Sequence, residues 1–231
     1  MCCLDSNENL QEQAQAIYEN LINNLENNGI IGDYCSIKSG FAFKNSWWEK
    51  SGIKVIKIGS INQDYLNINN CSYVSSDKIN KISPIFKLKG GDLVIALTGA
   101  TLGKFAIVPE IREIVFVNQR VGKFLLGDEP LEKLPYIYCL LKQNRIYDEL
   151  LNRSNGTAQS NISPFDIMSI PCVILEESVI KKFNLKTKAM FELIINNQLQ
   201  NKQLAELRDT LLPRLMSGKL DVSNVELKFK F

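Results

Sequence analysis

The sequence predicts an α+β protein in which one mixed domain lies between two helices. Residues 176–212 contain no Gly and no Pro, and apolar residues recur there every seven positions. A shorter stretch near the amino end, residues 7–27, has a similar apolar stripe. Between the two stretches, short apolar runs alternate with Gly, Asn, Ser and Asp, which is typical of strands joined by turns.

The long helix is expected over residues 176–220. Its heptad pattern is that of a helix packed lengthwise on another helix. The pattern consists of Phe183, Met190, Asn197, Leu204 and Leu211, with Leu193, Ile194, Leu207 and Leu215 on or beside the complementary positions. Such a helix is roughly 60 Å long at about 1.5 Å per residue, so it can hold two bodies at a fixed distance. We expect Pro213 to disturb the hydrogen-bond ladder and Gly218 to end the helix.

The first helix is expected over residues 7–27, with Asp5, Ser6 or Asn7 as its cap and a stop at Asn28-Gly29. A helix of this length is marginal alone and needs a partner. Residues 1–29 carry five acidic residues and no Lys or Arg, whereas residues 176–231 carry ten basic and seven acidic residues. Opposite charge and a matching stripe indicate that it packs on the long helix.

The middle segment, residues 30–175, is expected to form the mixed domain, and residues 221–231 a tail. The strands predicted in the mixed domain are residues 53–58, 93–97, 105–108, 114–117, 121–125 and 170–174. Residues 134–151 have helical spacing. Ser163 and Pro164 are typical of a helix start, and residues 89–92 of a turn.

Composition argues against the common enzyme classes. The chain has no His, which removes the commonest general base and any Ser-His-Asp triad. Its six Cys residues show no paired spacing, which indicates reduced cytoplasmic thiols rather than a zinc site. No run approaches the ~18 apolar residues of a membrane span. Residues 99–104 resemble a phosphate loop that is one residue too short. Binding is therefore the better class.

Polar loops supply the candidate binding residues. Asn and Gln suit adenine edges and Arg suits guanine, while Lys suits phosphates. The candidates for DNA contact are Lys38, Ser39, Phe41, Lys44, Thr98, Thr101, Lys104, Asn118, Gln119, Arg120, Arg153, Gln159 and Asn161. Alternatives stay open for several of them. Phe41 suits a core as well as a stacking platform, Asn118 suits a turn cap, and Gln159 and Asn161 suit bonds within their own loop.

The motifs, taken in order, resemble the specificity subunit of type I restriction–modification enzymes. They are Ser39-Gly40-Phe41-Ala42-Phe43, Lys89-Gly90-Gly91-Asp92-Leu93-Val94, Leu97-Thr98-Gly99, Val117-Asn118-Gln119, Gly156-Thr157-Ala158-Gln159-Ser160-Asn161-Ile162 and Leu211-Leu212-Pro213-Arg214-Leu215-Met216-Ser217-Gly218. The resemblance implies a non-catalytic DNA target recognition domain followed by a spacer helix. It also implies methyltransferase and restriction/translocase subunits as partners. S-adenosylmethionine, ATP and magnesium would then belong to those partners, and this chain would bind no cofactor.

The usual family member has two recognition domains and two paired spacers, whereas this sequence has one of each. We therefore expect the equivalent of the carboxyl-terminal half of a subunit, which pairs with a second copy of itself. Three alternatives remain: a coiled-coil structural or regulatory protein with a protein-binding domain, a silent or truncated cassette, and a half-subunit of a combined restriction–methylation enzyme.

Overall fold

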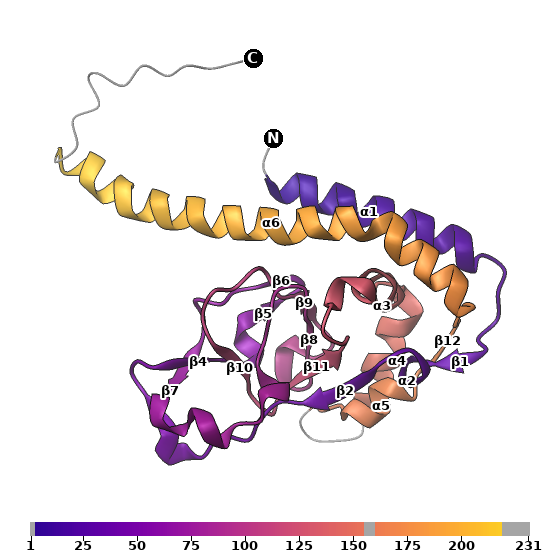
Figure 1. Ribbon diagram of the computed structural model, residues 1–231, viewed down its shortest axis with the longest axis horizontal. Helices are drawn as coiled ribbons and strands as arrows, with labels where there is room; N and C mark the ends of the chain where they lie inside the picture. The colour runs from indigo at the N-terminus through magenta and orange to yellow at the C-terminus, as the bar shows by residue number, and fades with distance from the viewer. Residues whose placement is uncertain (1–2, 155–159, 219–231) are drawn as a thin grey trace.

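The computed structural model describes residues 3–154 and 160–218 and shows a mixed domain beneath two helices (Figure 1). Helix α1 (Cys3–Ile22) lies along the first half of helix α6 (Glu177–Met216). The second half of α6 extends beyond the start of α1. The architecture confirms the predicted α+β class, with a short first helix and a long last helix. Among the described residues, no helix has the length and apolar character needed to cross a membrane.

The two helices run antiparallel. Near the start of α1, Asn197 donates a hydrogen bond to Asn7 over 2.8 Å. Near its end, the rings of Tyr18 and Phe183 meet edge to face with centroids 5.9 Å apart. Ala14 and Tyr18 are fully buried, so the apolar stripe of α1 faces the long helix and the domain. This burial supplies the stability that a 20-residue helix lacks on its own.

The observed helix boundaries correct several sequence predictions. Helix α1 starts at Cys3, so Asp5, Ser6 and Asn7 lie inside it and not at its cap. It ends at Ile22, because Asn24 adopts a left-handed backbone (φ 62°) that turns the chain. The turn lets the Asn28 side chain donate to the Ile174 carbonyl (2.9 Å) and accept from the Ile174 N–H (2.7 Å).

The predicted heptad seam holds only in part. The buried face of α6 consists of Ile180, Phe183, Asn184, Thr187, Phe191, Ile194, Ile195 and Gln198. Because α6 packs on both α1 and the domain, this face is broader than a seam, and Leu193 lies outside it, 51% exposed. The helix continues through Pro213 to Met216, and Gly218 follows in a left-handed conformation (φ 64°).

The domain contains three sheets. The largest has the strand order β2-β11-β8-β9-β6-β5, the second β10-β4-β7-β3, and the third β1-β12. The strands are β1 (Gly29–Ile30), β2 (Ser36–Ser39), β3 (Trp48–Glu49), β4 (Ile53–Ile56), β5 (Ile61–Asn62), β6 (Asp64–Leu66), β7 (Ser72–Val74), β8 (Leu93–Ala96), β9 (Phe105–Ile107), β10 (Val115–Val117), β11 (Val121–Leu125) and β12 (Pro171–Cys172). Pairs β4–β10 and β6–β9 are parallel, and the others are antiparallel.

Short helices connect and cover the strands. They are α2 (Ile31–Tyr34), α3 (Leu134–Leu141), α4 (Asn144–Ser154), α5 (Pro164–Met168) and the 3₁₀ turns η1 (Asn45–Trp47), η2 (Ile58–Ser60), η3 (Ser76–Lys81), η4 (Pro84–Phe86), η5 (Gly99–Thr101) and η6 (Pro130–Glu132). The single helix predicted over residues 134–151 is in fact two. The break at Lys142-Gln143 lets Lys142 reach Asp64 (2.6 Å) and Gln143 donate to the Tyr18 hydroxyl (3.0 Å).

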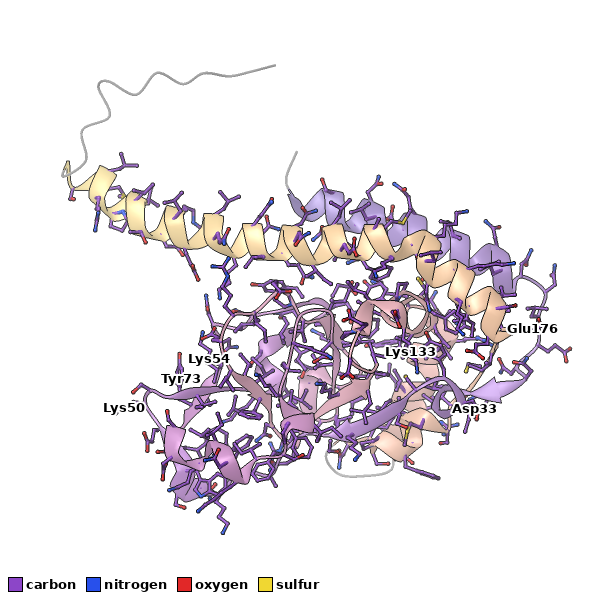
Figure 2. The ribbon with its side chains drawn as sticks, viewed as in Figure 1. Asp33, Lys50, Lys54, Tyr73, Lys133 and Glu176 are labelled. Atoms are coloured by element: carbon purple, nitrogen blue, oxygen red, sulfur yellow. The ribbon has the colours of Figure 1, made fainter. Side chains whose placement is uncertain are left out.

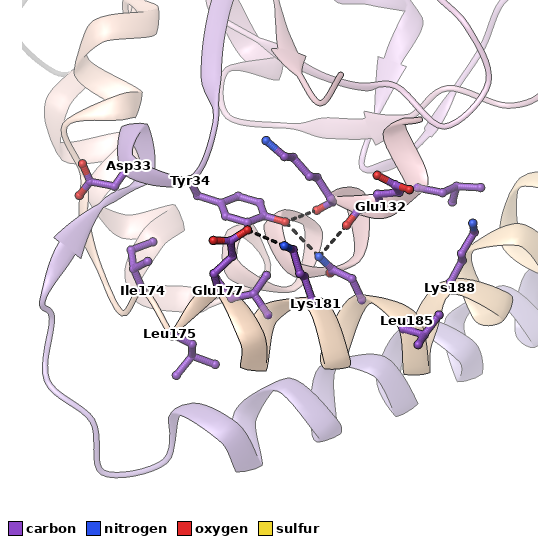
Figure 3. Close-up of a pocket in the computed structure, with 13 residues that line it drawn as sticks. Asp33, Tyr34, Glu132, Ile174, Leu175, Glu177, Lys181, Leu185 and Lys188 are labelled. Atoms are coloured by element: carbon purple, nitrogen blue, oxygen red, sulfur yellow. Dashed lines mark hydrogen bonds and ion pairs between the residues drawn. The ribbon is translucent and has the colours of Figure 1, made fainter. Parts of the chain in front are cut away.

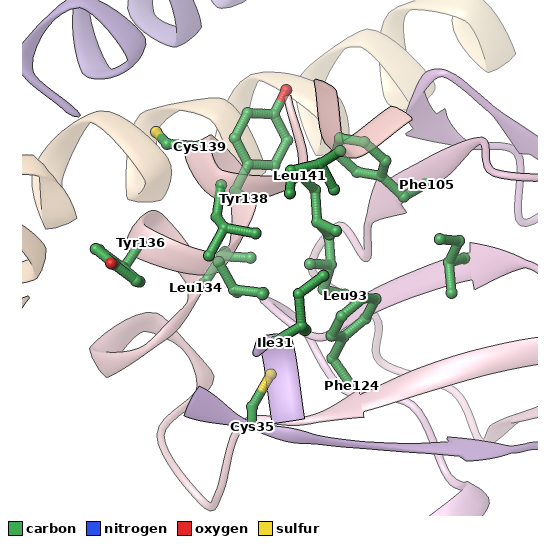
Figure 4. Packing of buried hydrophobic residues seen from close by; sticks show 14 of the residues in the cluster. Ile31, Cys35, Leu93, Phe105, Phe124, Leu134, Tyr136, Tyr138, Cys139 and Leu141 are labelled. Atoms are coloured by element: carbon green, nitrogen blue, oxygen red, sulfur yellow. The ribbon is translucent and has the colours of Figure 1, made fainter. Parts of the chain in front are cut away.

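The main core lies between the six-stranded sheet and helices α3, α1 and α6 (Figure 4). Leu93 and Ile95 of β8 face this core, whereas Val94 and Ala96 face a second cluster on the other side of the sheet. Burial on both faces explains why β8 is a continuous apolar run rather than an alternating one. A third cluster, rich in aromatic residues, fills the smaller lobe around β4, β7 and β10.

Asn184 joins the domain to the base of α6, beside a hollow of about 650 Å³ (Figure 3). It is 4% exposed and donates to the Glu132 carbonyl (2.8 Å) and the Tyr34 hydroxyl (3.2 Å). It also accepts from the Tyr136 N–H over 2.9 Å. Lys133 and Glu176 lie at this end of the domain, opposite Lys50 and Lys54 (Figure 2). One side chain thus bonds the base of α6 to three groups of the domain.

We expect Asn184→Leu to lower the free energy of unfolding by about 1–3 kcal/mol for each buried backbone group left without a partner. Urea denaturation measures the loss. The matched control is Asn196→Leu, the same change at an exposed position of α6, where an effect within about 0.5 kcal/mol is expected. Equal effects at the two positions would contradict the role of Asn184 as a joint.

Candidate nucleic-acid interface

Five polar segments meet along one edge of the two large sheets, which we call the polar edge: residues 38–41, 57–60, 97–101, 118–120 and 160–162. The topology explains why they meet. Strands β4 and β10 are parallel, so the segments that follow them lie at the same end. Strand β11 is antiparallel to β8 and β2, so its start lies beside their carboxyl ends.

Backbone hydrogen bonds hold these segments together. Phe41 donates to Val117 (2.9 Å), and Asn118 donates to Ile56 (3.0 Å). Leu97 donates to Arg120 (3.0 Å), which joins the third and fourth segments. The fifth segment is bonded in the same way, by Gly99 to Ser160 (3.2 Å) and Ile162 to Leu97 (2.9 Å), around a bridge between Thr98 and Asn161. The polar edge is therefore a continuous, preorganised surface.

Gln119, Arg120 and Asn161 are exposed on the polar edge, and Thr98 and Thr101 are half-buried. Asn118 has a different role, because it is 7% exposed and its side-chain oxygen accepts from the Arg120 N–H over 3.2 Å. Asn118 thus forms the turn that presents its two neighbours. A direct base contact by Asn118 stays a prediction.

Lys38 and Ser39 belong to β2, where Lys38 is exposed and pairs across the sheet with Lys123. Gly40 follows them, and a Cβ atom there would lie 2.4 Å from the carbonyl oxygens of Val117 and Asn118. A glycine is required for this close approach of two backbones. Lys104 lies half-buried at the end of the loop that begins at Thr98.

Two candidates for DNA contact, Phe41 and Lys44, lie in or beside the smaller lobe. The ring of Phe41 stacks on Trp47 at 5.9 Å and meets Phe43 edge to face at 5.0 Å. One side of Phe41 thus packs in an aromatic cluster, and its contact with DNA stays a prediction. Lys44 is exposed just before η1 in the same lobe.

Arg153 also has a structural role. Its guanidinium pairs with Glu149 at 3.2 Å, and it donates to the Asp166 carbonyl (3.1 Å) and the Ser169 hydroxyl (2.7 Å). These bonds attach α4 to the end of α5, and DNA contact by Arg153 stays a prediction. Gln159 lies outside the described residues.

Lys57 is a polar-edge residue that the sequence analysis missed. It directly follows β4, as Asn118 follows the parallel strand β10, and its ammonium lies 3.9 Å from the centroid of the Trp48 ring. A parallel pairing of the two strands would have pointed to it, but periodicity alone does not show which strands pair.

Three of the four free cysteines in the described residues are buried. Cys35, Cys71, Cys139 and Cys172 are free, and burial raises the pKa of the Cys35 thiol to about 12. No three His, Cys, Asp or Glu side chains in the described segments lie close enough together to hold a metal ion. The fold and the polar edge thus define a binding domain on a long helix.

Comparison with known proteins gives this binding domain a family. Residues 27–209 match the type I restriction modification DNA specificity domain. The MjaVIII specificity subunit, a type I restriction enzyme subunit of Methanocaldococcus jannaschii, is 29% identical over 200 residues, 84% of this chain and 46% of that protein. The HindI specificity subunit of Haemophilus influenzae is 32% identical over 104 residues, 45% of this chain and 22% of that protein.

A solved structure shares the fold. The S subunit of a type I restriction–modification system from M. genitalium has a TM-score of 0.57 at 13% identity, over 92% of this chain and 55% of that one. This chain belongs to the family of type I restriction modification DNA specificity domains, because the family match spans most of its length. It spans about half the length of the first of these relatives.

Proposed function

We propose that this chain recognises duplex DNA through the polar edge, as a non-catalytic specificity component of a type I restriction–modification system. The observation that carries the proposal is the convergence of five polar segments on one preorganised edge, within a chain of this family. Exposed amide and guanidinium groups at Gln119, Arg120 and Asn161 suit base edges, and Lys38 and Lys57 suit phosphates. Residues 30–175 form the recognition domain in this proposal.

The long helix has the second role. Residues 176–220 would act as the spacer, with residues 1–29 packed on it, and would hold a second recognition domain at a fixed distance. The second domain would come from another copy of this chain, so the target would be bipartite. Methyltransferase and restriction/translocase subunits would assemble on this frame in the cytoplasm, supplying S-adenosylmethionine, ATP and magnesium chemistry. The name of the MjaVIII relative, a type I restriction enzyme specificity subunit, supports these partners.

Electrophoretic mobility shift with random duplex DNA tests the proposal, with and without the methyltransferase subunit. Residues 30–175 carry 17 basic and 13 acidic residues, so binding by the chain alone should be weak. We expect it near the non-specific range of roughly 10⁻⁴–10⁻⁶ M at physiological salt, weakening further as salt rises. Sequence-specific binding should appear with the methyltransferase. Absence of DNA binding both alone and in the complex would refute the proposal.

Substitutions should separate base readers from phosphate binders. We expect Gln119→Ala or Arg120→Ala to cost about 1–3 kcal/mol on the cognate site and to relax specificity at one position. Lys38→Ala should weaken binding to all sequences alike and flatten the salt dependence. Sequencing of the methylated sites measures specificity, and Gln200→Ala on α6 is the matched control. If both the Gln119 and Arg120 variants keep the wild-type motif and affinity, the polar edge does not read bases at this turn.

A further inference from the structure

Phe165 is the most exposed aromatic side chain among the described residues. It is 73% exposed, whereas Tyr147 and Tyr65 follow at 39% and 38%. The neighbouring Ile167 is fully buried and anchors α5 in the main core, so Phe165 is not needed for that packing. A large apolar ring held in water is unfavourable by itself, and contact with an apolar surface would recover that free energy.

The backbone that carries Phe165 is firmly held. Ser163 caps α5 by accepting from the Asp166 N–H (3.1 Å), and the Asp166 carboxylate accepts from the Ser163 N–H (3.0 Å). Arg153 donates to the Asp166 carbonyl from the other side (3.1 Å). The Met168 sulfur accepts from the Ile37 N–H at 3.3 Å, which attaches the helix to β2. Phe165 is therefore presented on a rigid support rather than on a free loop.

Helix α5 is connected to the polar edge at two places. Asn161, which bridges to Thr98, precedes Phe165 by four residues, so their Cα atoms lie within about 13 Å of each other. The contact between Met168 and Ile37 brings α5 beside exposed Lys38. A DNA duplex bound to the polar edge would therefore meet the Phe165 ring beside groups that bind phosphates and base edges.

We propose that Phe165 is an apolar wedge that enters a partly unstacked base step of the bound duplex. This inference rests on the proposed function and extends it to a specificity-determining residue. An aromatic or aliphatic side chain inserted between bases unstacks them, and the cost depends on the step. Phe165 therefore favours flexible pyrimidine–purine steps without any hydrogen bond to a base. The role of Arg153 and Ser163 is to position the wedge.

Duplexes of one sequence, fully paired or with a central mismatch, test the wedge with the full chain at low salt. A mismatch lowers the unstacking cost, so fluorescence anisotropy should show wild-type protein preferring the mismatched duplex by roughly tenfold. Phe165→Ala should bind both duplexes equally, while its salt dependence stays as in the wild type. Phe165→Leu, which keeps an apolar wedge, should retain part of the preference.

Leu185→Ala is the matched control, because Leu185 is 77% exposed on α6 away from the polar edge, and it should keep the full preference.

A 2-aminopurine base beside the mismatch should brighten on binding wild type and stay dim with Phe165→Ala. If wild type binds DNA but shows the same ratio as Phe165→Ala, the wedge is refuted and the proposed function stands. If wild type binds neither duplex at any salt, alone or with the methyltransferase subunit, both are refuted. If Phe165→Ala does not fold, Phe165→Leu decides the test. A folded Phe165→Leu protein that prefers the mismatched duplex supports the wedge, and a folded Phe165→Leu protein without this preference overturns it.

Discussion

Replacing Asp92 by Asn is expected to lower the free energy of unfolding by about 3–5 kcal/mol, because it leaves a buried ammonium without its counter-charge. Asp92 and Lys123 pair at 2.8 Å, with side chains 2% and 10% exposed. Lys123 also donates to the Lys87 carbonyl (2.6 Å), and Asp92 accepts from the Lys89 N–H (2.9 Å). The pair links the turn before β8 to β11 and so supports the sheet from which the polar edge extends.

Burial is the largest influence on Asp92 and raises the pKa of its carboxyl despite the nearby Lys123. A raised pKa in the folded state means that the folded protein binds the proton more tightly than the unfolded chain does. Protonation of Asp92 in acid therefore does not lower the free energy of unfolding. In Lys123→Met the carboxylate is buried without a partner, so the deficit of that variant relative to wild type should shrink as the pH falls from neutral.

The double variant Asp92→Asn, Lys123→Met is the control that separates charge from packing. It keeps an acceptor for the Lys89 N–H and removes both charges, so it should recover most of the loss. Glu177→Gln is a second control, because Glu177 and Lys181 form an i,i+4 pair with side chains 82% and 74% exposed, and no measurable change is expected. Urea unfolding of all four variants measures the cycle. If the double variant is as unstable as Asp92→Asn, the loss of stability comes from side-chain packing and not from the unpaired charge.

The local elements were predictable where neighbouring residues decide them. Residues 121–125 form β11 as predicted, and the turn at Lys89-Gly90-Gly91-Asp92 is present, with Gly91 in the left-handed conformation (φ 81°) that it requires. Ser163 and Pro164 start α5 as expected, with a capping bond from the Asp166 N–H to Ser163. Each of these signals acts within a few residues.

Long-range contacts decided what the sequence could not show. The turn after α1 is accompanied by a bond between Asn28 and Ile174, and the break after α3 by a bond between Lys142 and Asp64, and the partners in both bonds are far apart in the sequence. The roles of the site candidates follow the same rule. Asn118 is an exception, because its turn role was one of two local alternatives and its bond to the Arg120 N–H spans only two residues, whereas the exposure of Gln119 depends on the fold. Two of the partners of Arg153, Asp166 and Ser169, lie 13 and 16 residues further along the chain.

The second large effect is expected on the pairing of two chains through the distal half of α6. Beyond Asn197, which bonds Asn7, the helix continues to Met216, about 29 Å further. Two residues of the predicted heptad pattern are exposed there, Leu204 at 58% and Leu207 at 53%, and Leu211 between them and the helix end is half-buried. A stripe at heptad spacing with this exposure suits an antiparallel partner helix, and a second copy of the chain offers the same stripe.

If two copies pair through this stripe, as proposed, we expect Leu207→Asp to dissociate the two-fold dimer. Burying a Leu side chain is worth about 1.5–3 kcal/mol, and a two-fold interface loses two of them, so the dimer weakens on the order of 3–6 kcal/mol. Light scattering coupled to gel filtration measures the mass. Leu185→Asp, the same change on the proximal half, should leave the dimer intact, and a wild-type chain that is monomeric both alone and with methyltransferase would contradict the prediction.

The proposed dimer would also fix the form of the target. Two identical domains related by a two-fold axis would read the same half-site on opposite strands, so the methylated motif should be an interrupted palindrome. Its half-sites should lie about one to two helical turns apart, because a turn is ~34–36 Å and the helix roughly 60 Å. Removing seven residues from the distal half of α6 keeps the heptad phase, so it should shorten the gap and leave the half-sites unchanged. Single-molecule sequencing of methylated DNA reads both features. An asymmetric bipartite motif, obtained with this chain as the sole specificity component, would show that the two halves of the target are not read by two copies of it.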